Sequence, residues 1–278
     1  MLAALILSVA AAIADNSPRP RIDVAFALDT TGSMGDEIDV VKEKIVDIAR
    51  KISSGQPRPD VRFGIVAYRD RGDIYLTKTF PFSREISEVR RALQGLDANG
   101  GGDEPEAVAE GLHATVHELQ WDFSPKTARM IFLIGDAGPH EYPDGKDWRK
   151  VVSEAAEKKI TITAIGCSGL NPWAEGVFAQ IAKRTGGELH HLTYTRVATD
   201  DRGHKRTVLS EGARTYLADG ELSEKDWKKG ASALVKEGKV RVVAAPPPMA
   251  ASAPVNNNLD AEIASGVSAK AKALGVAY

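Results

Sequence analysis

The stretch from Asp29 to Ser33 reads Asp-Thr-Thr-Gly-Ser and offers one carboxylate and three hydroxyl groups within five residues. Hard oxygen ligands of this kind suit a hard divalent cation such as Mg²⁺. Gly32 and Gly35 free the backbone to turn tightly, so the oxygens can converge on one point. The residue types and their spacing therefore predict a cation site, with Mg²⁺ as the first choice and Mn²⁺ or Ca²⁺ as the alternatives.

Two elements flank this stretch and determine where it lies. Residues 22–28 form an almost continuous apolar run, which is typical of a parallel strand covered on both faces. Over 36–52 apolar residues recur three or four positions apart, as on one face of an amphipathic helix. In open α/β sheets, the loop between such a strand and helix is where ligands bind.

Two later loops also combine glycine residues with an aspartate. Residues 99–108 read Asn-Gly-Gly-Gly-Asp-Glu-Pro-Glu-Ala-Val, a glycine-rich turn that contains Asp103. Its proline, Pro105, fits the first turn of a following helix. The run 128–134 reads as another buried strand and ends in Gly-Asp-Ala-Gly, which places Asp136 at its carboxyl end. Metal binding is the favoured role for Asp103, and capping of the next helix is the alternative.

Together the three loops resemble the metal-ion-dependent adhesion site of von Willebrand factor A domains. The sequence at 29–33 fits the first element of that site, Asp-x-Ser/Thr-x-Ser, and Asp136 matches its third-loop aspartate. The resemblance implies that Thr31 and Ser33 contact the metal directly. It also implies that Asp29 and Asp136 act mainly through water and hydrogen bonds, which suits Mg²⁺ because this ion keeps several waters.

The second loop departs from the common family pattern. Most A domains have a threonine there as the third direct ligand, whereas this chain has Asp103. The sequence Gly-Gly-Asp-x-Pro-Glu-Ala resembles a hemicentin-like branch that is common in bacterial members. A carboxylate in this position would hold the cation more tightly, yet would weaken its pull on an external carboxylate. The predicted metal site therefore comprises five residues: Asp29, Thr31, Ser33, Asp103 and Asp136.

The resemblance implies a doubly wound α/β fold over 21–194, with a mostly parallel six-stranded sheet and helices on both faces. One antiparallel edge strand is expected, because the short polar loop 69–73 joins its neighbours closely enough for a hairpin. Beyond 194 the sequence predicts a partly helical C-terminal extension over 195–245. Residues 246–278 read as a low-complexity tail rich in Pro, Ala and Asn, in which 259–278 is either a weak helix or disordered.

Composition is that of an ordinary globular protein, with 43% apolar and 27% charged residues. A net charge of −2 gives no reason to expect binding to nucleic acid or an anionic membrane. Residues 2–14 form an apolar run shorter than the ~20 residues of a transmembrane helix, and end in an Ala-x-Ala cleavage pattern. We predict a signal peptide over 1–14, a linker over 15–20, and a secreted or periplasmic protein without a transmembrane segment. A frayed or cytosolic N-terminal helix is the alternative, because no Lys or Arg precedes the run.

Three further motifs receive structural interpretations. The tripeptide Arg-Gly-Asp at 71–73 is one that integrins recognise elsewhere, but hairpin loops favour Gly and Asp in any case. His113 and His117 are one helical turn apart, without the glutamate or third ligand of a zinc site. His190 and His191 are adjacent in a predicted strand, so they should point to opposite faces and not chelate together.

Three functions compete. The first is a Mg²⁺-dependent module for protein–protein recognition, whose partner offers an acidic group to the open metal position. The second is an enzyme, because residues 29–32 also resemble the Asp-Lys-Thr-Gly loop of haloacid-dehalogenase-like phosphotransferases, with Asp29 as nucleophile. Residues 135–140 lack that family's second aspartate, and the glycine-rich loop has no role there. The third is a domain that binds partners without metal. We favour the first, a protein that is not an enzyme.

Overall fold

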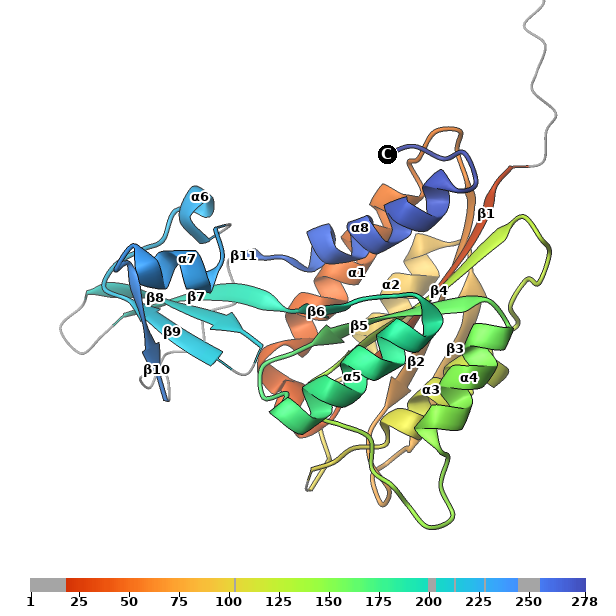
Figure 1. The fold of residues 1–278 in the computed structure, drawn as a ribbon, viewed down its shortest axis with the longest axis horizontal. Helices are drawn as coiled ribbons and strands as arrows, with labels where there is room; N and C mark the ends of the chain where they lie inside the picture. Colours follow the sequence, from red (N-terminus) through yellow and green to blue (C-terminus); the bar gives the residue numbers. More distant parts are fainter. Residues whose placement is uncertain (1–18, 103, 200–203, 213, 228, 245–255) are drawn as a thin grey trace, which may run out of the picture.

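The structure is a computed structural model that describes residues 19–102, 104–199, 204–212, 214–227, 229–244 and 256–278. The predicted signal peptide and Asp103 therefore lie outside the described residues. Six strands form the main sheet, in the order β3-β2-β1-β4-β5-β6 (Figure 1). Their bounds are β1 Arg21–Asp29, β2 Asp60–Tyr68, β3 Thr77–Ser83, β4 Thr127–Gly135, β5 Ile160–Gly166 and β6 Leu189–His191.

The pairing within this sheet confirms the predicted fold class. Every neighbouring pair is parallel except β2 and β3, which pair antiparallel at the edge. Strand order reverses between β1 and β4, so the loops that leave these two strands diverge to opposite faces and leave a crevice between them. This crevice is the place where the first and third predicted loops begin.

Helices cover both faces of the main sheet, which explains why β1 reads as a continuous apolar run. Alternate residues of β1, such as Val24 and Phe26, pack in one core, whereas Ala25 and Ala27 pack in the other. The first core is covered by α1 Ile38–Ile52, α2 Ile86–Gln94 and α8 Leu259–Lys272, and the second by α3 Val108–His117, α4 Trp148–Glu157 and α5 Pro172–Thr185.

A second, five-stranded sheet follows β6, in the order β10-β9-β8-β7-β11 and with antiparallel pairing throughout (Figure 1). The predicted partly helical extension does contain two short helices, but most of the antiparallel strands that make up the rest of it were not predicted. Alternating β-branched residues over 193–199 favour a strand, although their polar composition reads as a loop. Gly230, whose φ is 80°, directly precedes the second of these helices and separates it from the first. The elements are β7 Thr193–Thr199, β8 Lys205–Glu211, β9 Arg214–Ala218, α6 Glu224–Trp227, α7 Ala231–Lys236, β10 Val240–Val243 and β11 Asn256–Asn257.

The C-terminal end of the chain returns to the main sheet, where α8 lies alongside α1 (Figure 1). Leu259, Ile263, Val267 and Ala271 recur every four residues, and each is at most 1% exposed in the first core. Of the two alternatives for 259–278, the structure therefore has the helix, over Leu259–Lys272, although the composition had grouped it with a low-complexity tail. Its many alanines hide the apolar stripe in the composition, but they allow close packing.

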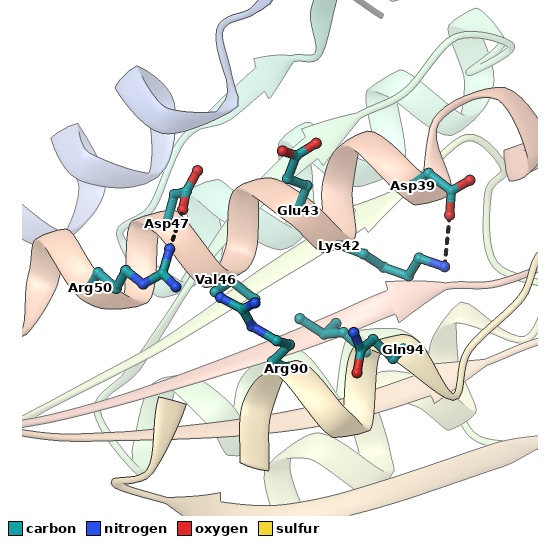
Figure 2. Close-up of a pocket in the computed structure, with 9 residues that line it drawn as sticks. Asp39, Lys42, Glu43, Val46, Asp47, Arg50, Arg90 and Gln94 are labelled. Carbon is teal, nitrogen blue, oxygen red and sulfur yellow. Dashed lines mark hydrogen bonds and ion pairs between the residues drawn. The ribbon is translucent and has the colours of Figure 1, made fainter. Parts of the chain in front are cut away.

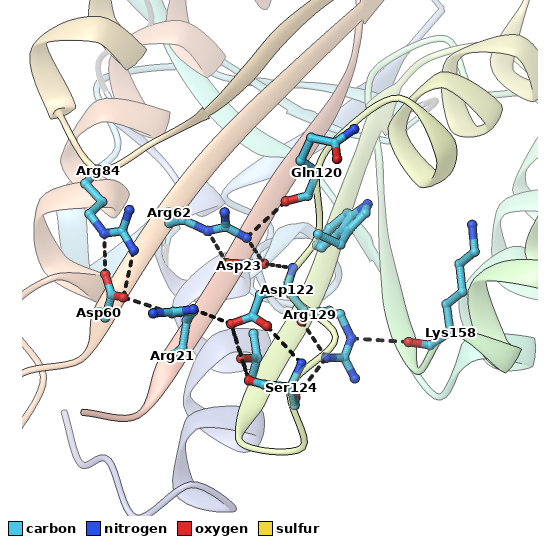
Figure 3. Close-up of polar contacts among 12 residues, drawn as sticks. Arg21, Asp23, Asp60, Arg62, Arg84, Gln120, Asp122, Ser124, Arg129 and Lys158 are labelled. Atoms are coloured by element: carbon cyan, nitrogen blue, oxygen red, sulfur yellow. Dashed lines mark hydrogen bonds and ion pairs between the residues drawn. The ribbon is translucent and has the colours of Figure 1, made fainter. Parts of the chain in front are cut away.

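The amino ends of the strands carry a network of ion pairs (Figure 3). Asp23 is fully buried, and its two carboxylate oxygens accept from Arg62 Nε at 2.8 Å and Arg62 Nη2 at 2.5 Å. Asp60 accepts from Arg84 Nε at 2.6 Å and from Arg21 Nε at 2.9 Å. Aspartates at this end of the sheet thus lie against guanidinium groups, which compensates the loss of hydration.

Candidate metal centre

The first loop is organised around Asp29, the last residue of β1, whose side chain is fully buried. Its Oδ1 accepts hydrogen bonds from the Thr31 amide at 2.9 Å and from Thr31 Oγ1 at 2.7 Å. Thr31 Oγ1 in turn lies 3.1 Å from Ser33 Oγ. Ser33 is exposed and belongs to the short 3-10 turn η1 Gly32–Asp36, so the loop opens to solvent at this residue.

The third loop meets the first because β4 pairs directly with β1. Asp136 follows β4 and is 2% exposed. Burial raises the pKa of Asp136 to about 6, against the opposing effect of a hydrogen bond from Ser33. Asp29, Thr31 and Ser33 are therefore joined in one chain of hydrogen bonds, and Asp136 lies close to Ser33 at its end.

Of the second loop, the residues before Asp103 lie against the first loop. The Gly32 amide donates to the Gly100 carbonyl at 2.9 Å. Gly101 has a φ of 61°, and a Cβ at this position would lie 2.9 Å from Thr31 Cβ. Only glycine fits this combination of backbone conformation and close approach. The structure thus places four of the five predicted residues together and the second loop beside them, while Asp103 lies outside the described residues.

Three buried carboxylates lie around this junction without a basic partner. Burial raises the pKa of Asp29 to about 7, with a further contribution from the charge of Asp136. Burial also raises the pKa of Glu106 to about 9, with Asp29 as the next cause. Asp29 Oδ2, Asp136 Oδ1 and Glu106 Oε2 are buried without a hydrogen-bond partner, and no Lys or Arg of the described ranges pairs with these groups.

Two of the buried acidic residues at this end of the sheet, Glu106 and Glu37, are not among the predicted site residues. Glu106 belongs to the glycine-rich loop that we quoted, but nothing in the sequence distinguishes it from a solvated glutamate. Glu37 precedes α1 and is 1% exposed; its Oε1 accepts from the Ser168 amide at 2.9 Å and from Ser168 Oγ. Burial raises the pKa of Glu37 to about 7. Both residues lie shortly after a glycine-containing turn, a feature that solvated glutamates share.

Within the described part of the chain, no three His, Cys, Asp or Glu side chains are grouped as a cage for a metal ion. The buried carboxylates are therefore not arranged to ligate one ion together. An ion at the loop junction would depend on hydroxyl oxygens and on water, as the donor set of Thr31 and Ser33 suggests.

The Arg-Gly-Asp tripeptide at 71–73 makes contacts with neighbouring residues of the same chain. Asp73 Oδ2 accepts from the Gly101 amide at 2.9 Å, which ties this loop to the glycine-rich loop. Arg71 pairs with Asp144 at 2.5 Å and lies over the ring of Tyr142 at 3.9 Å from its centroid. These contacts favour a structural role for the tripeptide.

The histidine pairs are also engaged in contacts with neighbouring helices. His117 Nε2 lies 2.7 Å from Glu154 of α4. His190 Nδ1 lies 2.7 Å from Glu262 of α8, whereas His191 Nε2 lies 3.3 Å from Glu175 of α5. The two adjacent histidines therefore point to opposite faces of the sheet, as the strand alternation predicts.

A groove of about 440 Å³ lies between α1 and α2, away from the three loops (Figure 2). Its walls carry charges of both signs that are partly paired, with Lys42 Nζ 2.7 Å from Asp39 and Arg50 Nη1 2.8 Å from Asp47. It contains none of the residues of the predicted metal site, and its mixed charge selects no class of ligand.

Comparison with known proteins agrees with the geometry. A family model described as "von Willebrand factor A domain" matches residues 23–194. The chain is 32% identical over 121 residues to alpha-protein kinase vwkA of Dictyostelium discoideum, a match that covers 43% of this chain and 19% of that protein. It is 23% identical over 239 residues to hemicentin-2 of Mus musculus, covering 82% of this chain and 4% of that protein. The chain thus spans less than a fifth of the length of either relative.

Among solved structures, the von Willebrand factor type A protein from Catenulispora acidiphila superposes with a TM-score of 0.48 at 16% identity. That match covers 66% of this chain and 46% of the other.

Proposed function

Since the chain belongs to the von Willebrand factor A domain family, we propose that it binds a divalent cation where its three loops meet. The loaded site then recognises a partner protein. In this proposal Thr31, Ser33 and Asp103 contact the ion, and Asp29 and Asp136 hold its waters. Mg²⁺ is the expected ion, because hydroxyl, carboxylate and water oxygens suit a hard cation that keeps part of its hydration.

One observation carries the proposal, the contrast between the two ends of the main sheet. At the amino ends, buried Asp23 lies against Arg62. At the carboxyl ends, Asp29 and Asp136 are almost equally buried, yet each has an unpartnered oxygen and forms no ion pair with a Lys or Arg of the described ranges. Burial of an uncompensated charge is costly, so these two carboxyl groups lack a compensating positive charge. A divalent cation would supply it.

The exposure of the site is suited to recognition. Gly32 and Ser33 are exposed, whereas Asp29 and Thr31 behind them are fully buried. An ion held here would present its open positions to solvent, where the group of a partner protein can replace a water. The partner itself is not identified by this geometry. If Asp103 contacts the ion, its charge reduces the attraction for an acidic group on that partner.

The same burial argues against the phosphotransferase alternative. A nucleophilic carboxylate must reach the phosphorus atom of its substrate. Asp29 is fully buried, its Oδ1 is occupied by two hydrogen bonds from Thr31, and a Cβ on Gly135 would lie 3.0 Å from its Oδ2. We therefore propose a binding protein and not an enzyme.

We also propose that the protein is exported, on the basis of the apolar run over 2–14 and its Ala-x-Ala ending. Over the ranges that the structure describes, no helix is both long and apolar enough to cross a membrane.

Isothermal titration calorimetry with Mg²⁺, Mn²⁺ and Ca²⁺ tests the cation site. We expect binding by the wild-type protein and none by Asp29→Ala or Asp136→Ala. Asp39→Ala is the matched control, because Asp39 is an exposed aspartate in the first turn of α1 and should leave affinity unchanged. Absence of binding for all three ions would support the metal-independent alternative.

The role of Asp103 has its own test. Asp103→Thr should weaken metal binding but keep a site, since threonine is the residue of most A domains at this position. Unchanged affinity would show that the assignment of Asp103 as a ligand is wrong. A pull-down of partners with and without chelator then connects the ion to recognition.

A further inference from the structure

We propose that Glu106 is a further residue of the metal centre, a positioning residue that holds the ion's water shell from behind the second loop and strengthens cation binding. This inference rests on the proposed cation site. Glu106 is the glutamate of the Gly-Gly-Asp-x-Pro-Glu-Ala sequence but is not one of the five predicted site residues, and its role follows from where the fold places it.

The backbone of Glu106 is held independently of any ion. Its amide donates to the Gly138 carbonyl at 2.9 Å, and its carbonyl accepts from the His140 amide at 2.7 Å. The next amide, that of Ala107, donates to the Arg69 carbonyl at 3.1 Å. The residue is therefore fixed between the loops that follow β2 and β4, immediately before α3. Such a fixed backbone is what a positioning residue requires.

The side chain points towards the first loop. Glu106 Oε1 lies 2.4 Å from the position that a Cβ on Gly101 would occupy, and Thr31 Cβ lies 2.9 Å from the same position. The Glu106 carboxylate and the proposed ligand Thr31 thus lie close to the same backbone atom of the second loop. The absence of a side chain at Gly101 is what lets the carboxylate approach.

The surroundings of this carboxylate lack a partner of opposite charge. Glu106 is 3% exposed, and its Oε2 has no hydrogen-bond partner among the described residues. Asp29, Asp70, Asp136 and Asp73 are the charged groups that act on it most strongly, and all are acidic. A buried, unpartnered carboxyl that faces other carboxylates is the arrangement expected around a cation.

Glu106 would act through water and not as a direct ligand, because the described acidic side chains form no three-membered cage. Mg²⁺ keeps several of its waters in proteins, and groups that orient such waters affect affinity. A cation beside Glu106 also favours the ionised form of its carboxyl, and this negative charge then attracts the ion directly. Both effects predict a higher affinity for the cation with Glu106 than without it.

The test is the affinity for Mg²⁺ of Glu106→Gln, which removes the charge but keeps the size of the side chain. We expect the dissociation constant from calorimetry to rise about tenfold or more, as for other residues that orient metal-bound groups. Burial raises the pKa of Glu106 to about 9, so this carboxyl is uncharged in the metal-free protein near pH 7, as glutamine is. The metal-free variant should therefore melt close to the temperature of the wild type, whereas its complex with Mg²⁺ is weaker. The melting-temperature gain on adding Mg²⁺ should therefore shrink. A purely structural role would change the metal-free melting temperature alone.

Glu110→Gln is the matched control. Glu110 lies one turn further along α3, is 7% exposed and also has an unpartnered Oε2. Its Oε1, however, accepts from the Lys146 amide at 3.2 Å and lies 3.9 Å from Arg71 Nη2, so its charge is compensated elsewhere. This variant should bind Mg²⁺ like the wild type.

The outcomes separate this inference from the proposed function. Wild-type binding with Glu106→Gln unchanged to within about twofold overturns the role of Glu106 and leaves the cation site standing. Absence of binding by the wild type overturns both. Glu106→Asp keeps the charge and shortens the side chain by one methylene, so it should fall between wild type and Glu106→Gln. If Glu106→Gln does not fold, an Asp variant with wild-type affinity counts against the inference.

Discussion

Metal-free protein should lose stability as the pH rises from 5 to 8, because of Asp29. Burial and the neighbouring Asp136 raise the pKa of the Asp29 carboxyl from 3.8 to about 7 in the folded protein. The unfolded chain releases this proton near pH 4, whereas the folded chain keeps it until about pH 7. The contribution of this group to stability is thus complete below pH 4 and is lost as the pH rises through 7.

The size of the effect follows from the same pKa difference. Between pH 5 and pH 7 the unfolded state has lost a proton that the folded state retains, and each pH unit costs about 1.4 kcal/mol. Because the folded state has itself lost half of this proton at pH 7, Asp29 alone lowers the free energy of unfolding by roughly 2 kcal/mol over this range. Asp136, with a pKa of about 6, acts in the same direction, but the two carboxyls interact and their effects do not add.

Urea unfolding at pH 5, 6, 7 and 8 in the presence of a chelator measures this loss. Other groups also titrate, so the informative quantity is the difference between the wild type and Asp29→Asn, a neutral variant of the same shape. The wild type should lose more stability than the variant, and saturating Mg²⁺ should reduce its loss by holding the carboxylate ionised. Equal pH dependence of the two proteins in chelator would refute the reasoning about burial at this site.

Two further predictions concern the framework that holds the loops. Ile263→Ala should lower the free energy of unfolding by about 2–5 kcal/mol, because Ile263 of α8 is fully buried in the first core; a change below about 1 kcal/mol in urea unfolding would mean that α8 is not an integral part of the domain. Arg62→Ala should cost about 3 kcal/mol or more, since it leaves the buried carboxylate of Asp23 without its guanidinium partner; a melting temperature within about 2 °C of the wild type would contradict that reading.

Local patterns in the sequence determined the main sheet and the three loops. A buried parallel strand such as β1 has a continuous apolar run in its sequence, and an amphipathic helix has apolar residues three or four positions apart. Both can be recognised without knowing which elements pack against them. The second sheet could not be read in this way. Its strands are short and partly polar. They are covered by α7, whose Leu234 belongs to the same buried cluster as Leu209 and Tyr216 of the strands. The apolar residues of α8 can likewise be recognised as a packing face only when the apolar surface of the first core beside α1 is known.

Charge compensation was decided entirely by the tertiary structure. Asp23 and Asp29 lie on the same apolar strand and look alike in the sequence, and both are fully buried. Parallel pairing brings Arg62 of β2 opposite Asp23, whereas it brings Tyr68 opposite Asp29. Arg62 lies about forty positions from Asp23 in the chain, so no local pattern can tell a buried carboxylate with an ion-pair partner from one without. Asp29 and Asp136 could be predicted as site residues from their loops and from the family resemblance. That Glu106 lies near them is seen only in the tertiary structure.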